Sequence, residues 1–325
     1  MTPLEKSILA TVSYYDIFDY PLTGFEIWRY LVLSEESKNN KFTAGELFEV
    51  ITGGGGLKNK ISQKHGFYFL VGREGIVEKR LWRKKLADEK WKKMKKVFEL
   101  VVLVPFVRGI FISGSLAMEN SKNDSDIDII VVAKYGRIWT VRTLMTALTT
   151  VLGVRRHGNK TEDRICLNHY ITDESLQIPF ESLYNAESYV HLTNLYKEDK
   201  NIFHLFQEQN GWIRNYLTNY KISELGSVRS IDKNRFFVFT SKIFEVILSG
   251  FLGNKIEKIF TSVESRRIER DALYKKSGGR ITIDDSQLEF HPDSHENFII
   301  PEFNRRMKGA GIMELANQKD SGLNE

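Results

Sequence analysis

The spacing of apolar and polar residues divides the chain into five stretches. The first has the pattern of short helices and a hairpin, the second of one long charged helix, and the third of strands alternating with helices. The fourth is mainly helical in spacing, and the fifth is a polar tail that we expect to be disordered. These stretches are residues 1–78, 79–104, 105–178, 179–313 and 314–325. The pattern predicts an α+β protein of several domains, with a small mixed-sheet core and a helical C-terminal domain.

The first stretch predicts three helices followed by a two-stranded hairpin. Thr23 and Thr43 stand where N-caps are expected, each before an apolar helical stripe. A glycine run at residues 53–56 separates the helices from a hairpin that turns at residues 64–66. Gly56 is not followed by the Lys-Ser/Thr pair of a phosphate-binding loop, so we interpret the run as a flexible break. This arrangement resembles a winged helix, a module that often binds DNA.

The charge of this winged-helix-like unit does not suit standard DNA docking. The helix expected to enter the groove carries Glu46 and Glu49 and has no Lys or Arg, so DNA phosphates would repel it. Lys58, Lys60 and Lys64 leave phosphate contacts through the hairpin open. We favour a role in binding a partner or presenting a substrate.

Positive charge is concentrated in the second stretch. The chain has a net charge of +5, yet residues 79–96 alone hold ten Lys or Arg against Asp88 and Glu89, so the remainder is net acidic. Apolar residues at helical spacing leave one stripe that can pack. Two interpretations stay open: a solvated linker helix, which we favour, and a surface that contacts nucleic acid, phosphate or a protein partner.

Composition favours a cytoplasmic protein without a membrane partner. Cys166 is the only cysteine, which excludes an intramolecular disulfide and a cysteine-based zinc site. The N-terminus lacks the basic and then apolar layout of a signal peptide. The most apolar window, residues 236–252, contains Lys242 and Glu245 and is too short for a bilayer span. We predict that it is a buried helix with its phenylalanines in the core.

The third stretch contains the residues that suggest chemistry. An apolar run ending at Ile112 is followed by Gly114 and Ser115, a turn in which backbone N–H groups and a hydroxyl can bind phosphate oxygens. Asp126 and Asp128 then begin a second apolar run. Because side chains alternate along a strand, the two carboxylates point to one face and can hold Mg²⁺ there.

Gly-Ser, ten intervening residues and Asp-Ile-Asp resemble the nucleotidyltransferase superfamily, the DNA polymerase beta-like group. The match is strongest over residues 111–132 and extends as a plausible layout over residues 105–173. The resemblance implies that Gly114 and Ser115 hold the triphosphate and that Asp126 and Asp128 bind Mg²⁺ or Mn²⁺. The implied activity is transfer of a nucleoside monophosphate from a nucleoside triphosphate to an acceptor, which we cannot name from the residues.

Two features depart from the family pattern. Met118 and Glu119 replace the usual Arg-Gly after the turn, and Lys122 is our candidate for the missing positive charge. The strand predicted at residues 165–171 also lacks the third carboxylate that in active members completes the metal site and can deprotonate the acceptor. Asn168 is the expected occupant by alternation, or His169 if the register is reversed.

An amide oxygen can bind a metal but cannot take a proton at neutral pH. Glu162, Asp163 and Asp173 are the possible substitutes for the missing carboxylate. The other candidates in the sequence are weaker. Arg155, Arg156 and Lys160 can add positive charge near the phosphates or form a solvated turn, and residues 291–295 have metal-binding types but a loop pattern without fixed geometry.

Two hypotheses follow from these residues. The first is a Mg²⁺-dependent nucleotidyltransferase that acts on a small molecule, a protein or an RNA end, and we favour it because the Gly-Ser and Asp-Ile-Asp motifs are intact. The second is a regulatory protein with a degenerate transferase core, which binds nucleic acid or a protein through its N-terminal unit and basic helix.

Overall fold

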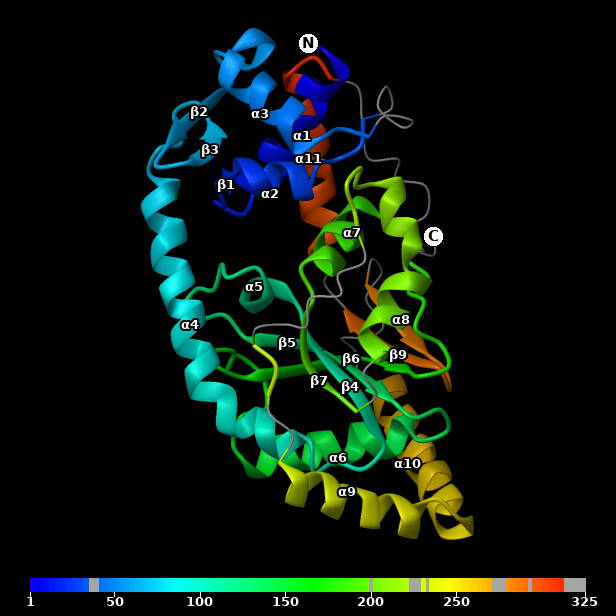
Figure 1. The fold of residues 1–325 in the computed structure, drawn as a ribbon. Coiled ribbons are helices and arrows are strands. Elements are labelled where there is room, and N and C mark those ends of the chain that lie inside the picture. The colour runs from blue at the N-terminus through cyan, green and yellow to red at the C-terminus, as the bar shows by residue number, and fades with distance from the viewer. Residues whose placement is uncertain are drawn as a thin grey trace.

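The computed structural model of the chain is a mixed α/β structure built around a central six-stranded sheet (Figure 1). It describes residues 1–34, 41–198, 201–221, 229–231, 234–270, 279–291 and 294–312. The α+β class predicted from the pattern is confirmed at this level. The tail predicted at residues 314–325 lies outside the described residues.

The N-terminal part consists of three helices and a three-stranded sheet in the order β1-β3-β2. Its elements are α1 (Pro3–Asp16), β1 (Leu22–Thr23), α2 (Gly24–Arg29), α3 (Ala44–Gly53), the 3₁₀ turn η2 (Gly55–Leu57), β2 (Ile61–Lys64) and β3 (Phe67–Leu70). Thr2, Thr23 and Thr43 each cap a helix through a reciprocal bond with a Glu three residues later. The expected helices and hairpin are therefore present.

The central sheet has the order β7-β4-β5-β6-β9-β8, and only β5 and β6 among its neighbours run parallel. Its first three strands are β4 (Val107–Ile112), β5 (Ile127–Ala133) and β6 (Ile165–Thr172). The helices around them are α4 (Ile76–Val101), the short α5 (Gly114–Ala117) and α6 (Ile138–Val151). These bounds agree with the strands and helices that the apolar runs predict.

The rest of the chain is less uniformly helical than we predicted, because it supplies the other three strands of the sheet. Its elements are α7 (Leu183–Val190), β7 (Thr193–Lys197), α8 (Ile202–Gln209), the 3₁₀ turn η3 (Gly211–Asn215), α9 (Arg235–Leu248), α10 (Phe251–Arg270), β8 (Arg280–Ile283), β9 (Gln287–His291) and α11 (Glu296–Gly309). A core limited to residues 105–178 would thus lack both edges of this sheet. Strands of four or five residues are too short for their period to stand out.

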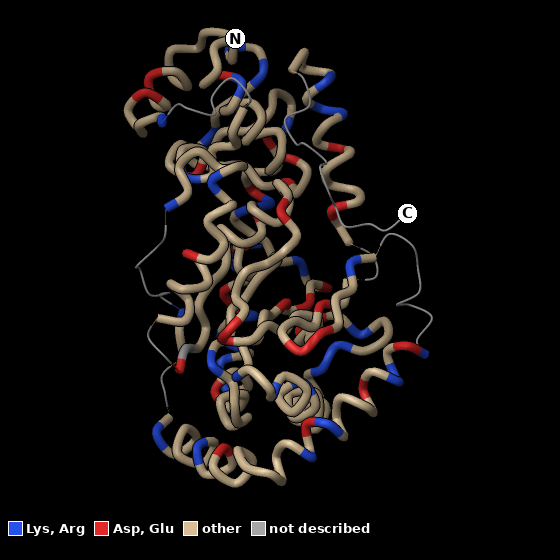
Figure 2. The backbone as a smooth tube through the Cα atoms, turned by 90° about the vertical axis from the view of Figure 1, so that its right-hand side faces the viewer, with Lys and Arg blue, Asp and Glu red and all other residues tan. Residues whose placement is uncertain are grey.

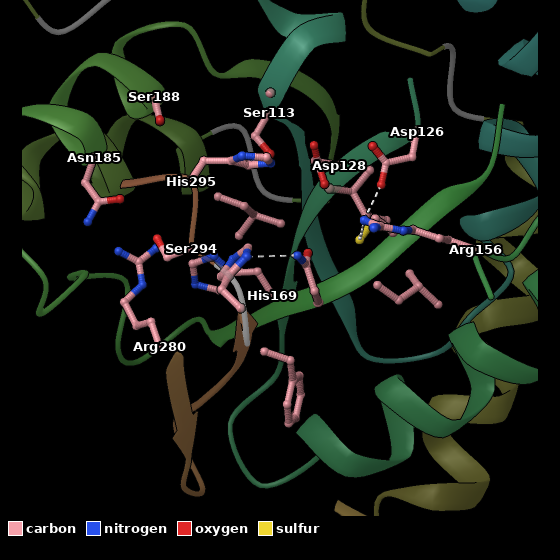
Figure 3. Close-up of a pocket in the computed structure, with 18 of the residues that line it drawn as sticks. Ser113, Asp126, Asp128, Arg156, His169, Asn185, Ser188, Arg280, Ser294 and His295 are labelled. Atoms are coloured by element: carbon pink, nitrogen blue, oxygen red, sulfur yellow. Dashed lines mark hydrogen bonds and ion pairs between the residues drawn. The ribbon is translucent and has the colours of Figure 1, made fainter. Parts of the chain in front are cut away.

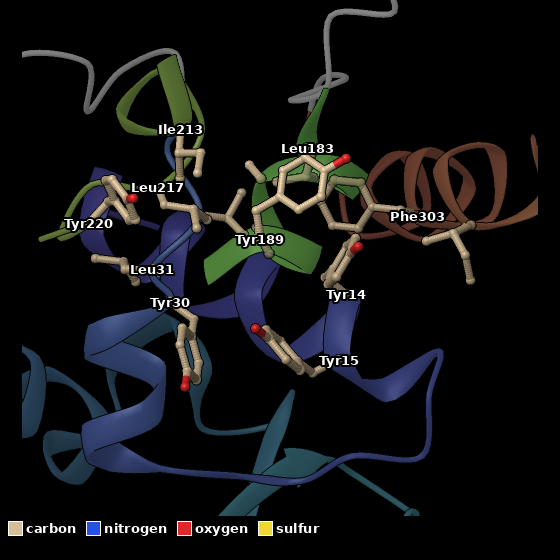
Figure 4. Close-up of a cluster of buried hydrophobic side chains, with 14 of the residues drawn as sticks. Tyr14, Tyr15, Tyr30, Leu31, Leu183, Tyr189, Ile213, Leu217, Tyr220 and Phe303 are labelled. Atoms are coloured by element: carbon tan, nitrogen blue, oxygen red, sulfur yellow. The ribbon is translucent and has the colours of Figure 1, made fainter. Parts of the chain in front are cut away.

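Two hydrophobic cores lie on opposite faces of the central sheet. One face packs against α4, α6 and α10 through residues such as Ile129 and Tyr170. The other face packs against α7 and α8, and this core continues into α1, α2 and α11. Figure 4 shows its tyrosines and aliphatic side chains, with Tyr14 of α1 beside Phe303 of α11. The N-terminal part therefore shares its core with the C-terminal half of the chain.

Polar contacts reinforce this junction. Arg306 of α11 forms an ion pair with Asp16 of α1 at 2.6 Å. The Tyr15 hydroxyl lies 2.5 Å from the Oε2 atom of the buried Glu187. Burial raises the pKa of Glu187 to about 8, so this carboxyl is mostly neutral at pH 7.

The basic side chains of α4 are largely occupied within the chain. Lys79, Arg80 and Arg83 bind the N-terminal part, at Asp19, Glu26 and the Phe18 carbonyl oxygen. Lys84, Lys90 and Lys93 bind Glu119 and Asp163 of the central part. The helix spans both parts along one side of the molecule (Figure 1). The favoured interpretation of a solvated linker was therefore wrong for Arg80, Arg83 and Lys90, whose side chains are only 5% to 11% exposed.

Residues 236–252 do not form the buried helix that we predicted. They are divided between α9 and the start of α10, and Phe236 and Phe251 are 69% and 74% exposed. The prediction was wrong because apolarity was taken to mean burial, which the sequence alone cannot establish.

Candidate functional site

A cavity of about 480 Å³ opens at the edge of the central sheet where β4 and β9 end and β5 and β6 begin. Side chains of α7 close another part of it. Figure 3 shows Asp126, Asp128 and Arg156 on one side of this cavity and Asn185, Arg280 and His169 on the other. The cavity thus has an acidic end and an end with imidazole and guanidinium groups.

The acidic end depends on a close contact between the glycine turn and β5. Ile112 pairs with Ile129, and the Ser113 N–H donates to the Asp128 carbonyl oxygen at 3.0 Å. Gly114 then adopts a φ of +62°, and a Cβ atom there would lie 2.5 Å from the Asp128 Oδ2 atom. Only glycine fits this turn, for both conformational and steric reasons. The predicted phosphate turn and the predicted metal aspartates are therefore adjacent.

Asp126 and Asp128 lie together, as the alternation predicts. One carboxylate oxygen of each and the Cys166 Sγ atom all lie within 4.8 Å of one another. The carboxylates suit Mg²⁺, which proteins commonly bind through one or two carboxylates plus substrate phosphates. A thiolate would suit a softer metal. Burial raises the pKa of Cys166 above its usual value, which keeps the thiol protonated and favours a site of two carboxylates.

The charges of the side chains at the acidic end favour a bound cation. Burial, and then the negative charge of Asp126, raise the pKa of Asp128 to about 7. Arg156 counters part of this charge, because its Nη1 atom lies 2.5 Å from Asp126 Oδ2 and 3.4 Å from Cys166 Sγ. Two carboxylates face one guanidinium, so the ionised site keeps a net negative charge. The residues present therefore fit a divalent cation.

Asn168 lines the same cavity as the aspartates, but β6 is not regular between Cys166 and His169. The register shifts between Asp128, which pairs with Cys166, and Ile130, which pairs with His169. This bulge puts one extra residue into β6, and the Asn168 Nδ2 atom lies 3.2 Å from His291 Nδ1. Cys166, which the sequence analysis did not single out for this role, occupies the position beside the carboxylates.

None of the carboxylates proposed as substitutes completes the site. Asp163 binds Lys90 and Lys93 instead, and Asp173 accepts a hydrogen bond from the Tyr135 N–H at 2.8 Å. In the described part of the chain, no third carboxylate groups with Asp126 and Asp128 at ligand spacing. The expectation of a substituting carboxylate is therefore not met by the described residues.

The predicted phosphate ligands are placed unequally. Gly114 lines the cavity, whereas Ser115 and the exposed Lys122 are not among its lining residues. Arg155 and Arg156, which the sequence analysis offered as further sources of positive charge, do line it. Their position follows from the pairing of the 155–156 segment with the start of β6.

The other end of the cavity contains a cluster whose members the sequence did not predict to lie together. Ligand atoms of His169, Glu289 and His291 lie within 4.8 Å of one another, because β6 and β9 pair His169 with Glu289. Arg280 of β8 already binds the buried Glu289 carboxylate at 2.6 Å. Burial lowers the pKa of both histidines to about 3, so they are neutral at pH 7. We interpret this cluster as structural, since its members bind one another and Arg280, and we call it the polar wall of the cavity.

The sequence pattern held one signal for this wall. His291 is the last residue of β9, not part of an irregular loop as we expected, and this strand fixes its orientation. Comparison with known proteins adds no assignment for either end of the cavity: no family model, curated protein or solved structure matches this chain.

Proposed function

We propose that the chain is a nucleotidyltransferase that depends on Mg²⁺ or Mn²⁺ and moves a nucleoside monophosphate from a nucleoside triphosphate to an acceptor. The observation that carries the proposal is the contact between Gly114 and Asp128, which leaves no room for a Cβ atom. A phosphate that touches the backbone of this turn lies beside both carboxylates. Phosphate binding and metal binding at a single point are what phosphoryl transfer requires.

In the proposed reaction, the residues of the acidic end bind either the metal ion or the phosphate groups. Asp126 and Asp128 would hold the ion, which when bound neutralises phosphate charge and stabilises the departing pyrophosphate. Gly114 lets phosphate oxygens approach the backbone closely. Arg156, now bound to Asp126, has further N–H donors that can turn to a phosphate oxygen once a cation neutralises that carboxylate.

The acceptor proton needs a different base from the usual third carboxylate. The Asn168 amide cannot take a proton, and the buried Cys166 thiol is a poor base because it stays protonated. Two exposed imidazoles are among the described residues that line the cavity. The Nδ1 atom of His157 already lies 3.0 Å from the Arg155 carbonyl oxygen, which leaves His295 as the candidate base. We assign it this role in the proposed reaction.

Isothermal titration of ATP, GTP, CTP and UTP, each with and without Mg²⁺, tests the proposal. We expect one or more nucleotides to bind the wild-type protein only with Mg²⁺, and Asp126→Ala/Asp128→Ala to lose that binding. Gly114→Ala should weaken it by about tenfold or more, because its Cβ atom would displace the Asp128 carboxylate. Asp124→Ala, an exposed acid just before the site, is the matched control and should leave binding unchanged.

Binding alone does not establish turnover, so pyrophosphate release is measured under the same conditions with candidate acceptors. His295→Ala should lower the rate of release while leaving nucleotide affinity unchanged. If no nucleotide binds the wild-type protein with or without Mg²⁺, the proposal is wrong.

A second function is favoured by one observation, the thiol of Cys166 beside the two aspartates. It is a regulatory protein whose core has lost catalysis and whose winged-helix-like N-terminal unit binds a partner. Glu46 and Glu49 are exposed on α3, so a protein partner suits this unit better than DNA. Mg²⁺-dependent nucleotide binding without pyrophosphate release from any acceptor would support this second function.

A further inference from the structure

Helices α9 and α10 expose an unusual number of large apolar side chains. Eight of these side chains are each more than half exposed. Six of them lie on α9 and in the first turn of α10, and together we call them the α9–α10 apolar face: Phe236, Phe239, Val246, Ile247, Phe251 and Leu252. Figure 2 shows α9 at the bottom left of the molecule, drawn mostly in the colour of uncharged residues. Single exposed apolar residues are ordinary, but a contiguous group of this kind marks a contact surface.

The polarity of these helices is the reverse of that of an ordinary surface helix. Glu245 of α9 is buried and accepts hydrogen bonds from the Phe106 N–H at 2.7 Å and from Arg108 at 2.8 Å. Glu257 of α10 accepts from the Trp139 N–H at 2.9 Å, at the start of α6. Acidic side chains thus hold both helices to the central part, while phenylalanines point away from it. In water, the opposite arrangement is the stable one.

The charge of the outer surface is almost entirely positive. Seven Lys or Arg side chains are exposed on the two helices, against one exposed acidic side chain, Glu269. Lys255 lies within the apolar face, with its Nζ atom 4.4 Å from the centre of the Phe251 ring. Phenylalanine and leucine beside exposed Lys and Arg are the composition of helices that lie in a membrane interface.

The geometry suits contact with a membrane surface. No single described helix is long and apolar enough to cross a bilayer, although α9 and α10 meet that measure when taken together. They are bent by 91° at the break between them, and Glu257 and Glu264 keep α10 bonded to α6. From these observations we propose that the α9–α10 apolar face docks on the surface of a bilayer containing anionic phospholipids.

A second copy of the chain is the main competing occupant, and the charges argue against it. A two-fold interface would bring this surface against its own copy, and so place exposed Lys and Arg opposite one another. Lysine is also depleted at such interfaces. A bilayer with anionic lipids complements both properties of the surface. Its headgroups carry negative charge, and the acyl chains beneath them are apolar.

Flotation with lipid vesicles tests the inference on the full chain. Wild-type protein should float with phosphatidylcholine vesicles containing about one-third phosphatidylserine, and more weakly with phosphatidylcholine alone. Phe239→Ser/Phe251→Ser/Leu252→Ser should lower partitioning by about tenfold or more, since it removes three of the inserted side chains. Circular dichroism and a thermal melt establish that this variant keeps its fold, which exposed positions permit.

A matched variant distinguishes vesicle binding through the α9–α10 apolar face from nonspecific binding through any exposed apolar residue. Phe25→Ser/Val151→Ser/Phe298→Ser changes three exposed apolar residues elsewhere and should bind vesicles as the wild type does.

The charge contribution is tested by Lys255→Gln/Lys258→Gln. This variant should lower binding to the anionic vesicles by about tenfold and affect neutral vesicles little. Lys92→Gln/Lys96→Gln, on α4, is its exposed control.

Three results would overturn the inference. Wild-type protein could remain in the lipid-free fraction with both vesicles, or the triple variant could bind as well as the wild type. Light scattering could instead show a wild-type dimer that the triple variant makes monomeric, without vesicle binding, and a second copy would then be the occupant. The triple variant should bind nucleotides as the wild type does, so a failure of vesicle binding is distinct from a failure of the proposed function.

Discussion

Cys166 and Asn168 stand two residues apart on β6 and make different contacts in the cavity. The bulge in β6 leaves Cys166 Sγ within 4.8 Å of an oxygen of each aspartate, whereas Asn168 contacts His291. A carboxylate at the first position would join the two already there. At the second position it would face the polar wall.

We therefore expect Cys166→Asp to bind Mg²⁺ about tenfold more tightly than the wild type, because Mg²⁺ affinity rises with the number of charged oxygen ligands. The same variant should melt at a lower temperature without Mg²⁺, since three buried carboxylates repel one another. Asn168→Asp is the matched control and should leave Mg²⁺ affinity unchanged. Titration calorimetry reads both, and a gain confined to Asn168→Asp would contradict the register described here.

The pKa of Asp128 gives a pH dependence with a defined sign. Because burial raises this pKa to about 7, the folded protein holds a proton on Asp128 at pH values where the unfolded chain has released it. Without metal, this contribution to stability is complete below about pH 4 and is lost as the pH rises to about 7. Urea unfolding at several pH values between about 4 and 7 gives the free energy of unfolding as a function of pH. In Asp128→Asn, the fall in this free energy that is due to Asp128 should be absent.

Mg²⁺ must displace the same proton. Its affinity for the wild-type protein should therefore rise by up to about tenfold per pH unit toward pH 7 and level off above it. An affinity independent of pH over this range would show that Asp128 is ionised without the metal, contrary to its burial.

The sequence predicted part of this site and could not predict the rest. The aspartate pair followed from the two-residue period of a strand, which holds wherever the pleat is regular. The glycine requirement followed from the same motif. The contacts of Cys166 and Asn168 depended on a bulge in β6, and nothing in the sequence of residues 165–171 indicates that bulge. One extra residue in a strand moves the side chains that follow it to the opposite face of the sheet.

Among the elements, α4 has a structural role that its charge alone did not reveal. The Lys90 ammonium is almost buried and donates to the Asn123 and Ser125 carbonyl oxygens and to Asp163 at 2.7 to 3.1 Å. It thereby holds the loop that leads into Asp126. A residue of α4 thus positions the candidate metal site from outside the cavity.

Lys90→Met should lower the free energy of unfolding by about 3 kcal/mol, because it leaves Asp163 and two carbonyl oxygens short of a partner. It should also weaken Mg²⁺ binding through the loosened loop. Lys93→Met removes an exposed partner of the same Asp163 and should cost less than about 1 kcal/mol. Urea unfolding measures both, and equal losses would mean that burial of Lys90 contributes nothing.

Element bounds could be predicted from periodic apolar patterns, whereas the burial of an element could not, because it depends on which other elements pack against it. The bounds of α6 and β5 followed from long apolar patterns. The exposure of α9 did not, since an apolar stripe indicates a contact but not whether that contact is with the chain itself.

Over the whole molecule, the N-terminal part and the central sheet are joined by one continuous core rather than by a linker. The sequence suggested separable domains because the composition changes sharply near residue 79. What it could not show is that α11, far along the chain, returns to pack against α1. Contacts between residues so distant in sequence leave no trace in local spacing.

This shared core predicts that the described parts unfold together. Phe303→Ala should cost about 3 to 5 kcal/mol, because the fully buried ring packs against Tyr14 of α1 and its loss leaves a cavity. Phe298→Ala, on the exposed side of the same helix, should cost less than about 0.5 kcal/mol.

Urea unfolding of the wild type should show one transition whether it is followed by circular dichroism or by tryptophan fluorescence, because Trp28 of the N-terminal part and Trp139 of α6 would lose their environments together. Phe303→Ala should move both signals to lower urea by the same amount. If only one signal moved, or if the wild type showed two transitions, the N-terminal part would be an independent domain and the core would not join it to the site.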